Sequence, residues 1–226
     1  MSRISMDIVR TTAAYSLAEA AHYLNLPLTT LRAWCLGQPG FRAVIRLDGK
    51  NPWALSFLNL VEGHVLAAIR REHKVPLIAV RKALKYVQDH LELDRPLVQA
   101  EFETDGLSLF VERLGLLINA SKEGQMAMRE ILAAHLKRIE RDGKGLPIKL
   151  YLFTRRDRSA SGPASVVVDP RIAFGRPVLV GRSVPTAVLA DRFKAGETLK
   201  ELAEDYETSP TAIEEAIRCE LDRQAA

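Results

Sequence analysis

The chain has 226 residues, 47% of them hydrophobic, with 32 lysines and arginines against 28 carboxylates. This length allows more than one domain, and the apolar content is enough for packed cores. No apolar run approaches the roughly 20 residues that span a bilayer, and the N-terminus lacks the apolar block of a signal peptide, so we expect a cytoplasmic protein. Cys35 and Cys219 are far apart in sequence without metal-ligand spacing, which predicts buried free thiols.

The charge is unevenly distributed along the chain. Residues 1–93 carry 12 lysines and arginines against 7 carboxylates, and residues 94–158 carry 12 against 10. Residues 159–226 carry 8 against 11. Because a surface that binds phosphates is basic, the first third of the chain is the better candidate for nucleic-acid binding.

Residues 16–34, "SLAEAAHYLNLPLTTLRAW", predict two short helices joined by a tight turn. Ser16 and Glu19 form a capping-box pattern that starts the first helix. Asn25 and Pro27 end it, because asparagine tolerates the left-handed conformation and proline removes a backbone donor. Two helices joined in this way cross steeply, and the second can enter a DNA major groove. An ordinary helical hairpin in an all-α core is the alternative.

The next segment predicts a short β-hairpin, or wing, after these helices. A strand-like run at residues 41–47 is followed by a turn at residues 48–50. Arg42, Arg46 and Lys50 alternate at even spacing, so in a strand they face the same side. A solvated strand face produces the same pattern. Residues 55–93 then predict two helices separated by "EHKVPL".

Residues 12–93 resemble the winged helix-turn-helix domain of MerR-type DNA-binding proteins. The resemblance lies in "YSLAEAAHYLNLPLTTLRAW", the wing, and "ALSFLNLVEGHVLAAIRREHKVPLIAVRKAL". It implies that Thr29, Thr30 and Arg32 on the second helix read DNA. It also implies that wing residues contact backbone phosphates, and those residues are Arg42, Arg46 and Lys50.

Residues 94–153 predict a small α+β unit. "LVQAEFETDGLSLFVE" alternates around an Asp-Gly turn and predicts a hairpin, whereas "KEGQMAMREILAAHLKRIERDGKG" predicts an amphipathic helix that ends at Gly143 and Gly145. "LPIKLYLF" predicts a further strand. His135 lies on the apolar stripe of the helix, where a core residue is the better interpretation than a ligand. No residue in this unit argues for a ligand pocket.

The segment "TRRDRSASGPAS", residues 154–165, has the composition of a linker. Beyond it, two short strands at 166–168 and 177–180 precede three predicted helices. The last two helices repeat the opening motif, with Thr198 and Glu201 at a second capping-box spacing. Glu214 and Glu215 occupy the positions that correspond to Arg32 and Ala33, and carboxylates there would repel DNA phosphates. We therefore expect this second unit to be an interaction surface.

Residues 165–218 resemble a bacterial domain of unknown function, a short hairpin plus helix-turn-helix. The matching stretches are "VDP", "GRPVLVGRSVPT" and "FKAGETLKELAEDY". This domain is known chiefly from antitoxins of VapBC-like toxin–antitoxin pairs, and a subset of those antitoxins joins it to a winged N-terminal domain. The resemblance therefore implies a VapB-like antitoxin whose partner toxin is a PIN-fold ribonuclease.

PIN-fold nucleases gather carboxylates to hold divalent metal, and arginine pairs with carboxylates through two hydrogen bonds. Arg155, Arg156 and Arg158 in the linker are therefore candidate toxin contacts, although ordinary solvated linker charges fit the same pattern. We find no HExxH, P-loop or GxSxG motif, so we expect no enzyme, metal site or cofactor.

The sequence thus predicts a mainly α fold with small β elements, in four parts. These are a MerR-like winged helix-turn-helix domain (1–93), an α+β middle unit (94–153), a linker (154–165) and a C-terminal helix-turn-helix domain (166–226). The expected function is that of a homodimeric antitoxin that neutralises a partner ribonuclease and represses its own operon by binding operator DNA. The alternative is a stand-alone transcription regulator without a toxin partner.

Overall fold

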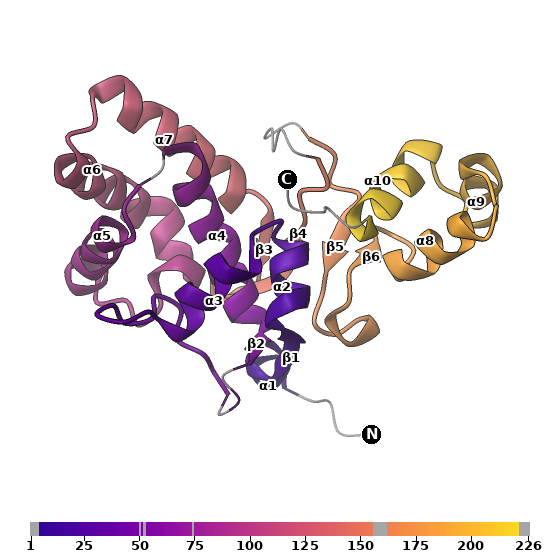
Figure 1. Cartoon of the computed structure of the whole chain (residues 1–226), viewed down its shortest axis with the longest axis horizontal. Helices are drawn as coiled ribbons and strands as arrows, with labels where there is room; N and C mark the ends of the chain where they lie inside the picture. The colour runs from indigo at the N-terminus through magenta and orange to yellow at the C-terminus, as the bar shows by residue number, and fades with distance from the viewer. Residues whose placement is uncertain (1–4, 50, 52, 74, 156–161, 222–226) are drawn as a thin grey trace.

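The computed structural model describes residues 5–49, 51, 53–73, 75–155 and 162–221, with backbone only for residues 70–73 (Figure 1). The fold is mainly helical with two small sheets. Its α-helices are α1 (Met6–Thr11), α2 (Leu17–Tyr23), α3 (Leu28–Leu36), α4 (Phe57–His73), α5 (Leu77–Leu91), α6 (Leu107–Ile118), α7 (Lys122–Leu136), α8 (Thr186–Lys194), α9 (Leu199–Asp205) and α10 (Pro210–Glu220).

The opening helix pair forms at the predicted positions. In α2 the Ser16 hydroxyl accepts from the backbone N–H of Glu19, and the Glu19 carboxylate accepts from the backbone N–H of Ser16, so the capping box is confirmed. Asn25 adopts a left-handed φ of 51° in the turn before α3. Strand β1 (Ala13–Ser16) leads into α2 and pairs antiparallel with β2 (Ala54–Ser56), which leads into α4.

The prediction of a β-hairpin wing is wrong. Residues 41–47, all of which the structure describes, form no strand, and Phe41 makes only an isolated bridge with Gln38. The backbone N–H groups of Val44 and Ile45 donate to the carbonyl of Trp34 at 2.8 and 3.0 Å. The segment therefore completes the C-terminal end of α3 instead of pairing with a partner strand, because free carbonyls at a helix end need donors.

The predicted hairpin at residues 97–112 is also wrong. The chain instead forms a 3-10 turn η1 (Pro96–Val98), a π-helical turn η2 (Phe102–Gly106) and helix α6. A Cβ on Gly106 would lie 3.1 Å from the Phe102 ring and 3.3 Å from Val87, so this glycine permits close packing against α5. Four of the aromatic and aliphatic residues that suggested alternation are instead buried in these helical turns, namely Phe102, Leu107, Phe110 and Val111.

The predicted amphipathic helix of the middle unit forms as α7 but ends at Leu136, before the expected glycines. The chain then enters strand β3 (Ile139–Arg141), and Gly145 lies with φ 75° in the turn that leads to β4 (Pro147–Tyr151). The strand predicted from "LPIKLYLF" is thus confirmed. The glycines end a β-turn and not a helix, because the strand pairing of Ile139 with Leu150 begins directly after α7.

A four-stranded antiparallel sheet joins the middle unit to the C-terminal segment. Its strand order is β3-β4-β5-β6, with β5 at Val166–Val168 and β6 at Val178–Leu179. Leu150 and Tyr151 of β4 pair with Val168 and Val167 of β5. Figure 1 shows this sheet between the N-terminal helices and helices α8, α9 and α10. The strands on either side of the expected linker, β4 and β5, therefore pair directly in one sheet.

Candidate nucleic-acid interface

Helix α3 presents its N-terminal turn to solvent. Pro27 precedes it with φ −58°, and Leu31, Trp34 and Cys35 on its inner side are buried against the core. Thr29 and Arg32 are exposed and lie one turn apart, whereas Thr30 is half-buried. The structure therefore places two of the three predicted base-reading residues fully on the open face of the second helix.

An aromatic side chain that sequence reasoning missed lies against Arg32. The guanidinium of Arg32 lies over the indole of Trp53 with 5.1 Å to the ring centroid, and the Trp53 residue is 51% exposed. The carbonyl of Trp53 accepts from the backbone N–H of Leu17 at 3.3 Å, so the indole is tied to the start of α2. A cation–π contact of this kind orients the Arg32 side chain at the face of α3.

The three predicted phosphate contacts have separate surroundings. Arg42 is exposed, and its backbone carbonyl accepts from the guanidinium of Arg81, which also lies 5.7 Å from the centroid of Phe41. Arg46 donates twice to Asp94, at 2.8 and 3.2 Å, in an ion pair whose side chains are 67% and 70% exposed. Lys50 lies outside the described residues.

The loop that carries Arg42 and Arg46 is fixed by a buried polar cluster. Arg95 pairs with Glu62 at 2.6 Å and with Asp48 at 2.7 Å. Asn59, fully buried on α4, donates to the carbonyl of Arg46 at 2.8 Å. Burial raises the pKa of Glu62, an effect that the hydrogen bond from Arg95 opposes but does not cancel. The loop is therefore held rigidly beside α3 without being a hairpin.

Of the predicted toxin contacts, Arg155 is described, whereas Arg156 and Arg158 lie outside the described residues. The Nε of Arg155 donates to Glu215 at 2.6 Å, and the hydroxyl of Thr154 donates to the same carboxylate. Glu215 is fully buried, so the expectation that its carboxylate faces outward on α10 is wrong. Its neighbour Glu214 is partly exposed and pairs with Arg218 one turn away.

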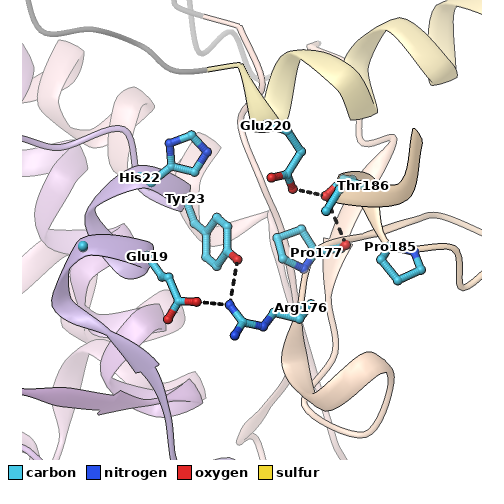
Figure 2. Close-up of a pocket in the computed structure, with 10 residues that line it drawn as sticks. Glu19, His22, Tyr23, Arg176, Pro177, Pro185, Thr186 and Glu220 are labelled. Atoms are coloured by element: carbon cyan, nitrogen blue, oxygen red, sulfur yellow. Dashed lines mark hydrogen bonds and ion pairs between the residues drawn. The ribbon is translucent and has the colours of Figure 1, made fainter. Parts of the chain in front are cut away.

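A side-chain contact joins the first helix-turn-helix to the loop before β6. Arg176 donates to Glu19 and, at 3.4 Å, to the hydroxyl of Tyr23, both on α2. Figure 2 shows these side chains lining a cavity of about 550 Å³, with Glu19 and Tyr23 on the α2 side and Thr186 and Glu220 on the side of the C-terminal segment. On that side the Thr186 hydroxyl donates to Glu220. The position of α2 is therefore linked to the C-terminal segment.

The histidine and the two cysteines considered in the sequence are buried. His135 is buried as predicted and lies against His64 and Phe153, with ring centroids 4.9 and 4.7 Å away. Cys35 and Cys219 are both buried, and burial raises the pKa of Cys35 to about 12. Among the described residues, no three His, Cys, Asp or Glu side chains group as metal ligands, and no helix is long and apolar enough to cross a membrane.

Comparison with protein families finds one match, over residues 166–218, to a family described as a protein of unknown function, DUF433. Two proteins of Mycobacterium tuberculosis are similar over most of the chain. One is named "Putative antitoxin VapB45" (29% identity, covering 90% of this chain and 92% of the relative), and the other is an uncharacterized protein, Rv2308 (27%, 90% and 88%).

A solved structure is similar over nearly the same length. The crystal structure of Rv2018 from Mycobacterium tuberculosis aligns with a TM-score of 0.68 and 25% identity, covering 91% of this chain and 98% of that one. The C-terminal resemblance predicted from the sequence is thereby confirmed, and the chain as a whole is similar to a protein that bears an antitoxin name.

Proposed function

We propose that this chain is a VapB-like antitoxin, which binds and neutralises a partner PIN-type ribonuclease toxin and represses its own operon by binding DNA. The observation that carries the proposal is the 29% identity to a protein named as an antitoxin over 90% of the chain. This similarity extends over the N-terminal part of the chain as well, whereas the family match covers only residues 166–218.

The DNA-binding half of the proposal rests on α3 and the following loop. In a MerR-like arrangement, Thr29, Thr30 and Arg32 would contact base edges, while Arg42, Arg46 and Lys50 would contact phosphates. Arginine bonds guanine edges through its fork, and the Trp53 ring already orients Arg32. The buried Arg95 cluster supports this role, because it fixes the loop relative to α3 before DNA arrives.

The toxin-binding half of the proposal starts from the arginines at residues 155–158. Arg155 pairs with Glu215 and its side chain is about half exposed, so a partner protein could reach this charge at the surface. We also infer a homodimer held at least partly by the C-terminal domain, since a two-fold dimer suits a palindromic operator. The strands β5 and β6 already belong to the four-stranded sheet, so the dimer is proposed on the operator argument alone.

Two assays on the full chain test the proposal. The first measures binding to the DNA upstream of its own gene, with Arg32→Ala and Arg42→Ala as variants and Lys200→Ala, an exposed lysine on α9, as the control. The second measures RNA cleavage by the ribonuclease encoded beside the gene, with and without the chain. Operator binding without any effect on a ribonuclease would favour the stand-alone regulator. If the chain neither binds the operator nor inhibits the ribonuclease, both functions are contradicted.

A further inference from the structure

An open apolar groove of about 1000 Å³ lies between the N-terminal helix and the loop that joins β5 to β6. It lies outside the DNA-binding face, since neither α3 nor residues 41–49 line it. Its walls are mostly apolar, and the side chains used below are Ile8, Val9, Phe57, Pro170 and Phe174. Ile8 and Phe174 are 58% and 93% exposed. An aromatic ring so exposed beside an apolar groove is typical of a recognition surface.

The backbone holds Phe174 in this exposed position against its own preference. Ala173, Phe174 and Gly175 have φ values of 48°, 55° and 79°, three left-handed residues in succession. This conformation is unfavourable for the two residues that carry a Cβ, so the surrounding structure must enforce it. Tyr15 does so on one side, because its hydroxyl donates to the carbonyl of Gly175 at 3.1 Å. Strain that serves to display a phenyl ring indicates a function for the ring.

Two arginines on the rim of the groove are each paired with a carboxylate and keep unused N–H donors. Arg171 donates through Nε and Nη2 to Asp169, whose side chain is 1% exposed, and Arg176 donates through Nη1 to Glu19 and Tyr23. Within the described residues, Nη1 of Arg171 and Nε and Nη2 of Arg176 make no hydrogen bond. Both arginine side chains are about half exposed, at 49% and 47%. Each guanidinium can therefore donate hydrogen bonds to a further carboxylate from a binding partner.

We propose that this groove is the main docking surface for the partner ribonuclease, and that it takes a segment of that protein combining apolar side chains with carboxylates. The inference rests on the proposed antitoxin function. Phe174 and the groove would bury the apolar side chains, while Arg171 and Arg176 would pair with the carboxylates.

The unused N–H donors on the rim favour this partner over a second copy of the chain. In two copies that meet groove to groove, these donors of Arg171 and Arg176 would face each other without acceptors, which costs free energy once water is excluded. The apolar walls also distinguish the groove from a surface for DNA, which is predominantly basic and polar. An acidic, amphipathic protein segment satisfies both the walls and the rim.

The test compares Phe174→Asn with the wild-type chain. Asparagine tolerates the left-handed conformation, so this variant removes the ring without disturbing the fold and its thermal midpoint is expected to equal or exceed that of wild type. Binding to the purified ribonuclease is expected to weaken by roughly 30-fold, as for a central aromatic contact. The control is Leu116→Asn on α6, which removes a 72% exposed side chain away from the groove and should leave the affinity unchanged.

The outcomes separate the groove from the antitoxin function itself. If the wild-type chain binds the ribonuclease and Phe174→Asn binds equally well, the groove inference is overturned while the antitoxin function stands. If the wild-type chain does not bind the ribonuclease, both are overturned. If Phe174→Asn instead converts a dimer to a monomer in sedimentation with unchanged ribonuclease affinity, the groove belongs to a second copy and the inference is wrong.

Discussion

The hydroxyl of Tyr15 donates to the backbone carbonyl of Gly175 at 3.1 Å, across 160 residues of sequence. Tyr15 is 1% exposed, and burial raises the pKa of its phenol, so it remains a neutral donor at physiological pH. The contact joins the strand that leads into the first helix-turn-helix to the loop that displays Phe174. Together with the pair of Arg176 and Glu19, this contact holds β1 and α2 against the loop between β5 and β6.

We first predict that Gly175→Ala destabilises the chain by roughly 2–3 kcal/mol. A Cβ at this position would collide with the Tyr15 hydroxyl, and φ is already 79°. The matched control is Gly181→Ala, where φ is 77° but nothing lies within 4 Å of the added Cβ. In Gly181→Ala the free energy of unfolding should fall by only about 1 kcal/mol, the strain of placing a residue with a Cβ at positive φ. Chemical denaturation measures both, and equal losses would show that the Tyr15 contact contributes nothing.

Local signals in the sequence were sufficient for the helix starts. Ser16 with Glu19 and Thr198 with Glu201 form capping boxes because each pair lies within one turn of the same helix. The same reasoning failed for residues 41–47, because their N–H groups bond to the carbonyl of Trp34, a partner that strand propensity does not reveal. Propensity gives way to such tertiary contacts.

The candidate site was predictable only in part for the same reason. The spacing of Thr29 and Arg32 placed both on the exposed side of α3, as a helix requires. The stacking of Arg32 on Trp53 and the burial of Glu215 depend on how distant segments pack. The place of Trp53 in the sequence, close to the basic residues at 42–50, was the signal that could have indicated the first of these contacts.

We next predict that Trp53→Ala weakens binding to the operator by about 1 kcal/mol, the size of a partly exposed cation–π contact. Without the indole, the Arg32 side chain would be mobile in the free protein, so its loss of conformational entropy would count against DNA binding. Because Trp53 carries no charge, the dependence of binding on salt concentration should stay as in wild type. An electrophoretic mobility assay at several salt concentrations measures both quantities, and an unchanged affinity would separate Trp53 from DNA binding.

A further prediction concerns the exposed pair of Arg46 and Asp94. Such pairs contribute roughly 0–1 kcal/mol to stability, so a phosphate can displace the carboxylate at small cost. Asp94→Asn should therefore leave the thermal midpoint nearly unchanged and strengthen binding to all DNA sequences alike. Asp191→Asn is the control, since Asp191 forms a similarly exposed contact on α8. Weaker or unchanged DNA binding by Asp94→Asn would argue against a phosphate contact at Arg46.

The contact of Glu19 with Arg176 predicts a dependence of stability on pH. Burial opposes ionisation of Glu19, but hydrogen bonds from Arg176 and Ser16 outweigh it and lower its pKa below the usual value. A lowered pKa stabilises the fold above the unfolded-state value of about 4.5, and this contribution is lost as pH falls through the folded-state pKa. Glu19→Gln should cost at most about 1 kcal/mol at pH 7 because the pair is partly exposed, and nothing near pH 2. Denaturation at both pH values measures the difference, and a loss that does not shrink in acid would contradict this origin.

The last prediction separates the structural role of Arg155 from a role in toxin binding. The Glu215 carboxylate is fully buried and accepts from Arg155 at 2.6 Å and from Thr154. Removing the guanidinium in Arg155→Ala leaves a buried charge with a weaker set of partners, which should destabilise the chain by roughly 1–3 kcal/mol. Arg155→Ala/Glu215→Gln should recover most of that loss, because the amide carries no charge and still accepts from Thr154. If the double variant regains stability and still binds the ribonuclease as tightly as wild type, Arg155 is a structural residue and not a toxin contact. If it regains stability but not binding, the guanidinium itself contacts the toxin.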